Sequence, residues 1–247
     1  MRRSRSADNA VRCSFCHKRQ ADIDHLISSP SDYPRAYICD ECIRVCSSIL
    51  ADGRPREKAD GTEPLAIGPP EPSEYPAQAA AYISLVPGND VMEALTKQGP
   101  RMVNAIKNLN EEDAASPYAP GKWSIKEVLG HVIDTERIWA YRALHFARQD
   151  PAPLAAFDGG SYVRAAGFNA HTLQYLVYEF TAVRDSTVYL LDELDAEAWM
   201  RRGTAGGHEY SVRALAYMIA GHELHHRRVL EDKYGRPSVR ARTPLSH

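Results

Sequence analysis

All five cysteines of this 247-residue chain lie within its first 46 residues. Cys13 and Cys16 form one Cys-x-x-Cys pair, Cys39 and Cys42 form a second, and Cys46 follows one helical turn later. Four thiolates at this spacing predict a closed tetrahedral Zn²⁺ site. A segment this short has too few apolar residues to fold on a core alone, so we expect a small, treble-clef-like module that depends on zinc.

A proline-rich stretch separates this module from the rest of the chain. Residues 51–76 contain six prolines and little apolar periodicity, which is typical of an extended linker. Downstream, apolar residues recur at helical spacing, and no alternating strand pattern follows residue 85, so a mainly α protein is predicted. The expected parts are a zinc module at 1–50, a flexible linker at 51–76, a four-helix bundle at 77–236 and a tail at 237–247.

The four helices differ in how clearly their ends are marked. Ser124 and Glu127 form a capping box, which predicts a helix start. Gly99-Pro100 predicts a kink or a break in the first helix, and residues 150–169 are predicted to be rich in loop. The helices are expected at residues 89–110, from Ser124 onward, at 173–194 and at 211–234.

Histidines occur at positions where this periodicity predicts core residues. His222 and His226 lie on the inward seam of the last helix, and His131 has the same spacing on the second helix. Buried imidazoles need partners, and a shared divalent metal, Zn²⁺ or Ni²⁺, would satisfy all three while leaving positions open for water or a thiol. The alternative is that each histidine is a core residue hydrogen-bonded separately. The other histidines, treated as surface or packing residues, are His17, His25, His145, His171, His208, His225 and His247.

Residues 222–226 read HELHH, which matches the H-E-x-x-H pattern of zinc proteases. A protease of that class needs a third ligand downstream, but Val229 stands where one such pattern has glycine. No strand is predicted on which an extended peptide could lie. We therefore expect that the chain is not a protease, which leaves the role of Glu223 open.

Three stretches together resemble the DinB/YfiT-like superfamily over about residues 76–235. They read YISLVPGNDVMEAL, YAPGKWSIKEVLGHVIDTERIWAYRALHFAR and RRGTAGGHEYSVRALAYMIAGHELHHRRVL. The resemblance implies a four-helix bundle, often dimeric, with a divalent metal held by His131, His222 and His226. Relatives that use mycothiol or bacillithiol imply a metal-dependent transferase or isomerase acting with a low-molecular-weight thiol. No catalytic residue is assigned.

The segment CSFCHKRQADIDHLISSPSDYPRAYICDECIRVC resembles the N-terminal zinc-binding domain of the ClpX unfoldase, up to about Leu50. It has His17 where that family commonly has glycine. The resemblance implies zinc on Cys13, Cys16, Cys39 and Cys42, and a role in dimerisation or in docking adaptors and unfolded proteins. No nucleotide-binding G-x-x-x-x-G-K-[ST] motif occurs, so we expect no ATPase activity.

The module carries more apolar residues than it can bury, so we expect a homodimer or a protein partner; the alternative is that they wrap the zinc or pack on the bundle. They are Leu26, Ile27, Ile38, Ile43, Val45, Ile49 and Leu50. Cys46 is expected to be a packing residue, with a spare ligand or redox thiol as the alternative.

Net charge and hydropathy place the chain among ordinary soluble proteins. The net charge is −2, no apolar run reaches the roughly 20 residues of a membrane span, and the basic N-terminus lacks the apolar stretch of a secretory signal. We therefore expect a cytoplasmic protein that does not bind nucleic acid or membranes. Two functions remain open: a metal-dependent thiol transferase, or a non-enzymatic adaptor or stress-related binding protein.

Overall fold

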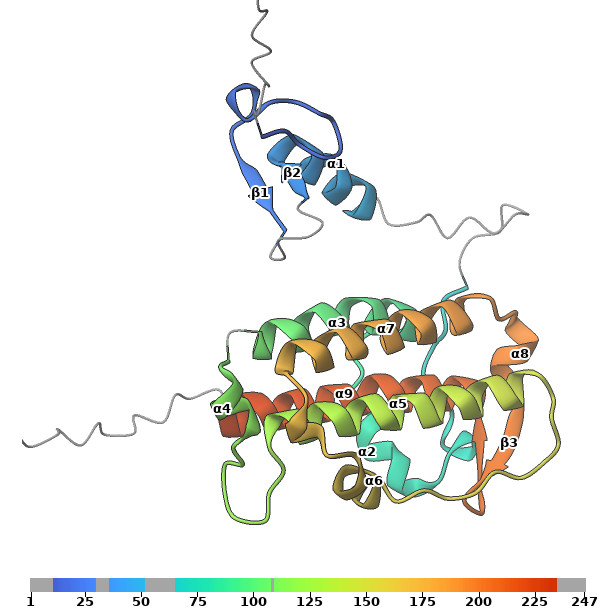
Figure 1. The fold of residues 1–247 in the computed structure, drawn as a ribbon. Helices are drawn as coiled ribbons and strands as arrows, with labels where there is room; N and C mark the ends of the chain where they lie inside the picture. The colour runs from blue at the N-terminus through green and yellow to red at the C-terminus, as the bar shows by residue number, and fades with distance from the viewer. Residues whose placement is uncertain (1–10, 30–35, 52–64, 108, 235–247) are drawn as a thin grey trace, which may run out of the picture. The chain divides into compact units, whose positions relative to one another are not determined.

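The computed structural model describes residues 11–29, 36–51, 65–107 and 109–234. The chain divides into two compact units between Pro64 and Leu65, drawn in Figure 1. Side chains are described as far as Cys46 in the first unit and from Leu65 in the second. None of the helices in these ranges is both long enough and apolar enough to cross a bilayer.

The first unit is a small zinc-finger fold. A short helical turn, η1 (Gln20–Asp22), precedes strand β1 (Leu26–Ser28), which pairs antiparallel with β2 (Tyr37–Cys39). Helix α1 (Asp40–Ala51) follows β2 directly, so that Cys39 ends the strand and Cys42 lies in the first helical turn. A hairpin followed by a helix, with cysteines at both ends, is the treble-clef-like arrangement expected from the spacing of the cysteine pairs.

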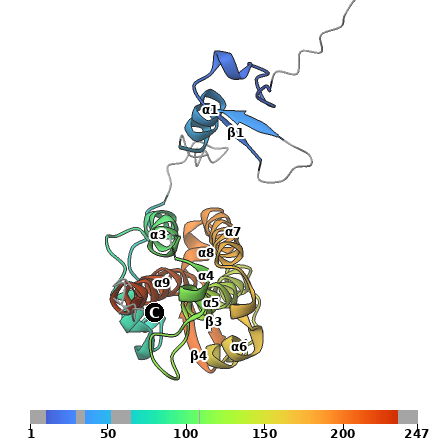
Figure 2. The same ribbon diagram turned by 60° about the vertical axis from the view of Figure 1, so that its left-hand side comes forward.

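The second unit is a four-helix bundle. Helix α3 packs beside α7 in one layer and α5 beside α9 in the other, and each layer contacts the other (Figures 1 and 2). The long helices are α3 (Val91–Ile106), α5 (Ile125–Ala147), α7 (Leu173–Asp192) and α9 (Val212–Tyr234). Shorter helices at the periphery are α2 (Ala80–Ile83), α4 (Glu111–Ala115), α6 (Gly159–Ala166) and α8 (Ala196–Met200). The predicted bundle is therefore confirmed.

The predicted helix ends hold where capping chemistry marked them. Ser124 accepts a hydrogen bond from the Glu127 N–H while the Glu127 side chain accepts one from the Ser124 N–H, which caps α5. Of the kink or break expected at Gly99-Pro100, the break does not occur, because α3 continues through Pro100. Burial of α3 between α7 and α9 offsets the single helical hydrogen bond that proline cannot make.

A β-hairpin and a short helix correct the all-α expectation for this unit. Strands β3 (Arg202–Ala205) and β4 (His208–Ser211) pair antiparallel, and α6 lies within the stretch predicted to be loop. The hairpin turn is Gly206-Gly207, whose φ angles of 60° and 80° suit the twist of paired strands. Each strand has only four residues, too few for an alternating pattern to stand out.

The predicted linker is too long at its C-terminal end. Residues 65–76 pack on the bundle: Ile67 is buried, and its carbonyl accepts a hydrogen bond of 3.0 Å from the Tyr217 hydroxyl. Glu74 is buried and accepts hydrogen bonds from Ser211, at 2.7 Å, and from Arg213. Residues 52–64 of the linker and the tail at 237–247 lie outside the described residues.

Helix α2 also fixes the packing of α9. A Cβ atom at Gly221 would lie 2.0 Å from the backbone oxygen of Tyr82, so α2 and α9 touch backbone to backbone. Only glycine permits this approach. The contact holds the Tyr82 ring against the histidines of α9, as described below.

Candidate metal centres

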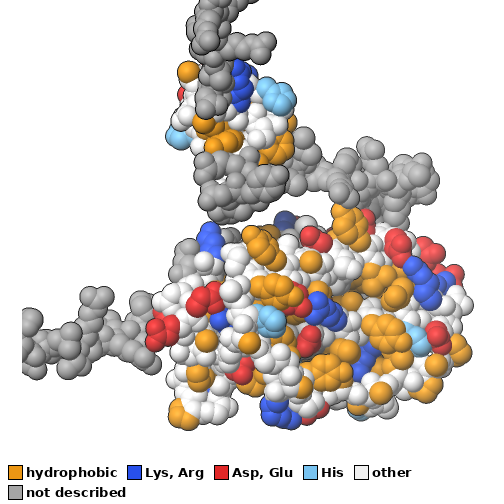
Figure 3. Space-filling view, viewed as in Figure 1, with side chains coloured by type: hydrophobic (Ala, Val, Ile, Leu, Met, Phe, Trp, Pro, Cys, Tyr) orange, Lys and Arg blue, Asp and Glu red, His pale blue; other side chains and the backbone are white. Residues whose placement is uncertain are grey.

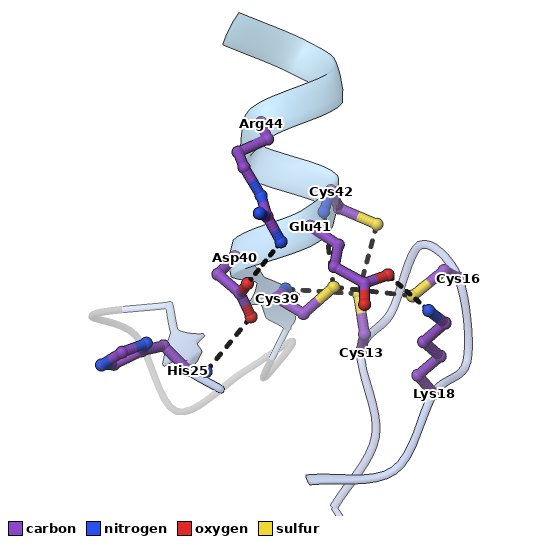
Figure 4. Close-up of polar contacts among 9 residues, drawn as sticks. All are labelled: Cys13, Cys16, Lys18, His25, Cys39, Asp40, Glu41, Cys42 and Arg44. Carbon is purple, nitrogen blue, oxygen red and sulfur yellow. Dashed lines mark hydrogen bonds and ion pairs between the residues drawn. The ribbon is translucent and has the colours of Figure 1, made fainter. Parts of the chain in front are cut away.

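The four cysteines of the first unit converge as the two Cys-x-x-Cys pairs predicted (Figure 4). The Sγ atoms of Cys13 and Cys42 are 3.8 Å apart, and those of Cys16 and Cys39 are 3.6 Å apart. Tetrahedral zinc with Zn–S bonds of about 2.3 Å requires S···S separations of about 3.8 Å. The residues present therefore fit zinc, and the cluster has the geometry of a closed structural site.

Backbone groups around the cluster stabilise thiolates. The N–H groups of Phe15 and Cys39 each donate to Cys13 Sγ at 3.4 Å. Burial acts to raise the pKa of Cys13, but these bonds and one from Cys16 outweigh it and lower that pKa to about 6. A thiolate is the form that binds metal.

Three side-chain contacts hold the cysteine loops in place. Asp40 accepts a hydrogen bond of 3.2 Å from the His25 N–H and pairs with Arg44 at 3.0 Å, while Lys18 pairs with Glu41 (Figure 4). His17 has a φ of 63°, which explains why related modules commonly carry glycine there. These contacts support the metal loops from outside the cluster.

Cys46 stands apart from the cluster. It is exposed on α1 and is not among the four grouped cysteines, so it is not a packing residue within the module.

In the second unit, His131 of α5 meets His222 and His226 of α9. The Nε2 atom of His222 lies 3.1 Å from the Nε2 atoms of both His131 and His226. At a metal–nitrogen distance of about 2.1 Å, two ligand nitrogens are about 3.0 Å apart at a right angle and about 3.4 Å apart at the tetrahedral angle. The three rings therefore fit one divalent ion, and no carboxylate of the described residues belongs to the group.

Aromatic rings and a glycine enclose this histidine centre. The rings of Tyr82 and Trp139 contact the His222 ring at centroid distances of 5.3 and 5.1 Å, and Trp123 contacts His131 at 4.9 Å. At Gly159, the first residue of α6, a Cβ atom would lie 2.7 Å from His131 Cε1. The backbone of α6 therefore bounds the centre on the side of His131.

Burial keeps the three imidazoles neutral. Desolvation lowers the pKa of His131 to about 4. Desolvation, with the neighbouring histidines, lowers the pKa of His226 to about 3 and that of His222 well below its ordinary value. Near neutral pH each ring therefore offers a lone pair, as a metal ligand must.

Glu223 belongs to a buried ion cluster and not to the histidine group. Arg184 of α7 donates to Glu223 Oε2 at 2.6 Å and forms two bonds with Glu136 of α5, at 2.9 and 2.8 Å. All three side chains are at most 5 % exposed. Arg184 also donates to the Leu95 carbonyl of α3, so this cluster joins all four long helices. The sequence-based prediction missed it.

The remaining histidines are surface or packing residues, as expected, where they are described. His145 is buried and contacts the Ala152 carbonyl at 2.8 Å, whereas His171 stacks on Tyr175 and His225 is exposed. His17, His25 and His208 are also exposed, and His247 lies outside the described residues.

The fold and this geometry define a helix-bundle protein with a metal-ligand group between two of its long helices, joined to a four-cysteine zinc finger. Residues 94–230 match the family model of the DinB superfamily. The chain belongs to the DinB superfamily. Residues 11–52 match the model of the ClpX C4-type zinc finger, in agreement with the resemblance seen in the cysteine segment.

Two solved structures are similar to this chain. YfiT from Bacillus subtilis, described as a probable metal-dependent hydrolase with an unusual four-helix bundle topology, matches with a TM-score of 0.53 and 15 % identity over 70 % of this chain and 96 % of that one. A mycothiol-dependent maleylpyruvate isomerase matches with a TM-score of 0.47 and 12 % identity over 56 % of this chain and 58 % of that one. At this identity the likeness to YfiT establishes the fold.

Proposed function

We propose that the bundle is a metal-dependent enzyme domain that activates water or a small thiol for attack on an electrophilic substrate. The observation that carries the proposal is the convergence of His131, His222 and His226 within 4.8 Å of one another, on two packed helices. Three neutral ligands leave coordination positions open, unlike the closed four-cysteine site. The description of YfiT as a probable metal-dependent hydrolase also supports a metal-dependent enzyme domain.

A divalent ion in this centre would lower the pKa of a bound water or thiol and polarise a substrate oxygen. The chain's own residues supply the surroundings. The Tyr82 and Trp139 rings pack against His222 and limit access of bulk water. Glu223 is held by Arg184, so it is placed to stabilise the bundle and not to act as the general base of the H-E-x-x-H motif.

Metal analysis of the full-length protein tests this proposal. The wild type is expected to carry two ions per chain. His222→Ala/His226→Ala should lose one of them, Cys39→Ser/Cys42→Ser should lose the other, and His171→Ala, which changes an exposed histidine, should keep both. Turnover of 4-nitrophenyl acetate, or of chlorodinitrobenzene with a small thiol, should disappear with the histidine-bound ion. A wild type that binds metal only through its cysteines contradicts the proposal.

A second function is proposed for the zinc finger: self-association or docking of protein partners. Phe15, Ile27 and Val45 are 63, 55 and 59 % exposed on this small unit. Exposed apolar side chains at this density favour a protein contact. Ile49 and Leu50, which were part of the same expectation, lie outside the described side chains. If the bundle has no turnover, this contact would make the chain an adaptor.

Light scattering of the full chain tests the second function. We expect a wild-type dimer and a monomeric Ile27→Ser/Val45→Ser variant. Hydrophobic side chains also occur among charged ones on the bundle face in view in Figure 3, so the control must change a side chain of this kind. Tyr178→Ser is the control, because Tyr178 is 68 % exposed on the bundle. A wild type that is monomeric and captures no chaperone or protease subunit contradicts the docking function.

A further inference from the structure

A cavity of about 340 Å³ adjoins the histidine centre. Its walls include Tyr82 of α2 and Trp139 of α5, the two rings that also contact His222. Met218, one turn before His222 on α9, also lines it. The volume lies within the range of small-molecule sites, and the lining is largely aromatic and apolar.

The cavity also contains a buried cation. Arg142 of α5 is 5 % exposed, and it donates one hydrogen bond of 2.9 Å to the Ala155 carbonyl. Its guanidinium carbon lies 5.4 Å from the centre of the Phe157 ring. No carboxylate of the described residues pairs with it, and burial lowers the pKa of its guanidinium from the ordinary value.

Arg184 is a second buried arginine of this protein, and its guanidinium has carboxylate partners. It is 4 % exposed, and it is paired with two carboxylates. Burial of an arginine without an anion costs several kcal/mol, and a guanidinium does not relieve that cost by losing its proton. Among the residues that the structure describes, no carboxylate offsets this cost for Arg142, and the space beside it is a cavity.

We propose that this cavity binds a small molecule with a carboxylate group, which Arg142 recognises, and an apolar body that lies against Tyr82 and Trp139. The single guanidinium and the apolar lining favour a monoanion over a phosphate dianion, which needs more cationic donors. The inference rests on the proposed function in one respect, namely that this molecule is the substrate delivered to the histidine centre. The anion site itself does not depend on a metal.

Calorimetric titration with benzoate, and with neutral benzamide of the same shape, tests the site in the full-length protein. Benzoate is expected to bind at least about tenfold more tightly than benzamide, because only benzoate supplies the missing charge. Arg142→Gln should remove that preference, whereas Arg142→Lys should retain part of it. Arg148→Gln, which changes the exposed C-cap residue of the same helix, paired with Glu193, should bind both compounds as the wild type does.

The inference is overturned if the wild type binds the two compounds equally, or if it binds neither at millimolar concentration. In that case Arg142 serves only to hold the loop at Ala155, and Arg142→Gln would lower the melting temperature without changing ligand preference. The titration is repeated on EDTA-treated protein, because benzoate binding without metal separates this inference from the proposed function. Absence of turnover in the metal-loaded wild type, with intact benzoate binding, would count against the enzyme and not against the anion site.

Discussion

Gly159 packs so closely on the His131 ring that any side chain at this position would disturb the histidine centre. Gly159→Ala would place a Cβ atom 2.7 Å from His131 Cε1, so the His131 ring must turn or α6 must move away. We expect a loss of metal affinity of about 10- to 100-fold, the range seen when the surroundings of a metal ligand are disturbed.

Gly160→Ala is the matched control for this prediction. The nearest atoms to a Cβ there are the ends of the Arg164 and Asp158 side chains at 3.3 Å, which can move. Competition with a chelating dye measures the affinity of both variants. Equal affinities would show that the position of α6 does not constrain His131.

Substitutions of Arg184 and Glu223 are expected to lower the free energy of unfolding by different amounts. Arg184→Met leaves two carboxylates buried without a cation, which costs about 3–5 kcal/mol. This unit should then melt about 10 °C lower. Glu223→Gln should cost less than about 1 kcal/mol, because the amide oxygen can still accept from Arg184 and the cluster loses its excess negative charge.

Differential scanning calorimetry, with metal analysis of both variants, checks this pair. Glu223→Gln is expected to keep its metal. A Glu223→Gln protein that is stable but has lost the histidine-bound ion would show that Glu223 acts on the centre, and the assignment of a structural role would be wrong.

The sequence predicts metal ligands better than it predicts their surroundings. His131, His222 and His226 follow from helical periodicity, because residues on one inward face of a helix are fixed by spacing. The ion pair of Glu223 depends on Arg184, which is 39 positions away on another helix. Periodicity within one helix carries no information on such a partner.

At the level of structural elements, Glu74 joins residues 65–76 to the start of α9. Burial acts to raise the pKa of Glu74, but hydrogen bonds from Arg213, Ser211 and the Glu71 N–H lower it to about 2, against 4.5 in the unfolded chain. The carboxylate therefore contributes stability above pH 4.5, and this contribution is lost as the pH falls toward 2.

Denaturant unfolding of wild type and Glu74→Gln across this pH range measures the effect. The free energy of unfolding of the wild type should exceed that of the variant by on the order of 2 kcal/mol at pH 6, and the difference should vanish near pH 2. A difference that does not change with pH would mean that the ion pair with Arg213 adds nothing to stability.

Elements with strong local signals were predicted, and those formed by single close contacts were not. The capping box at Ser124 and Glu127 marks the start of α5 from two residues alone. The β3–β4 hairpin rests on Gly206-Gly207 and on Gly203, where a Cβ atom would lie 2.1 Å from the Phe146 ring. Gly206-Gly207 was a usable turn signal, whereas the packing of β3 on Phe146 could not be read from the sequence.

For the whole molecule, the division at Pro64 and Leu65 predicts two independent units. The first is built around its four-cysteine group, whereas the second has two hydrophobic clusters of its own. Chelation at room temperature should therefore unfold the zinc finger while most of the helical signal remains.

Circular dichroism before and after chelation, together with a 65–247 fragment, checks this expectation. The fragment should melt within about 2 °C of the corresponding transition in the full chain, because a linker between independent units transmits little stability. A fragment that is markedly less stable would show that the zinc finger supports the bundle.

Helix α9 is buried along most of its length but not at its end. Every residue from 214 to 224 is buried, whereas His225 and Arg228 are exposed and His226 is half-buried. Amide hydrogens in the buried part should exchange with solvent only when the whole bundle opens, while those after His226 should exchange through local fraying. An ion bound to His222 and His226 spans this boundary, so metal loading should slow exchange in the last turns of α9 far more than in its centre.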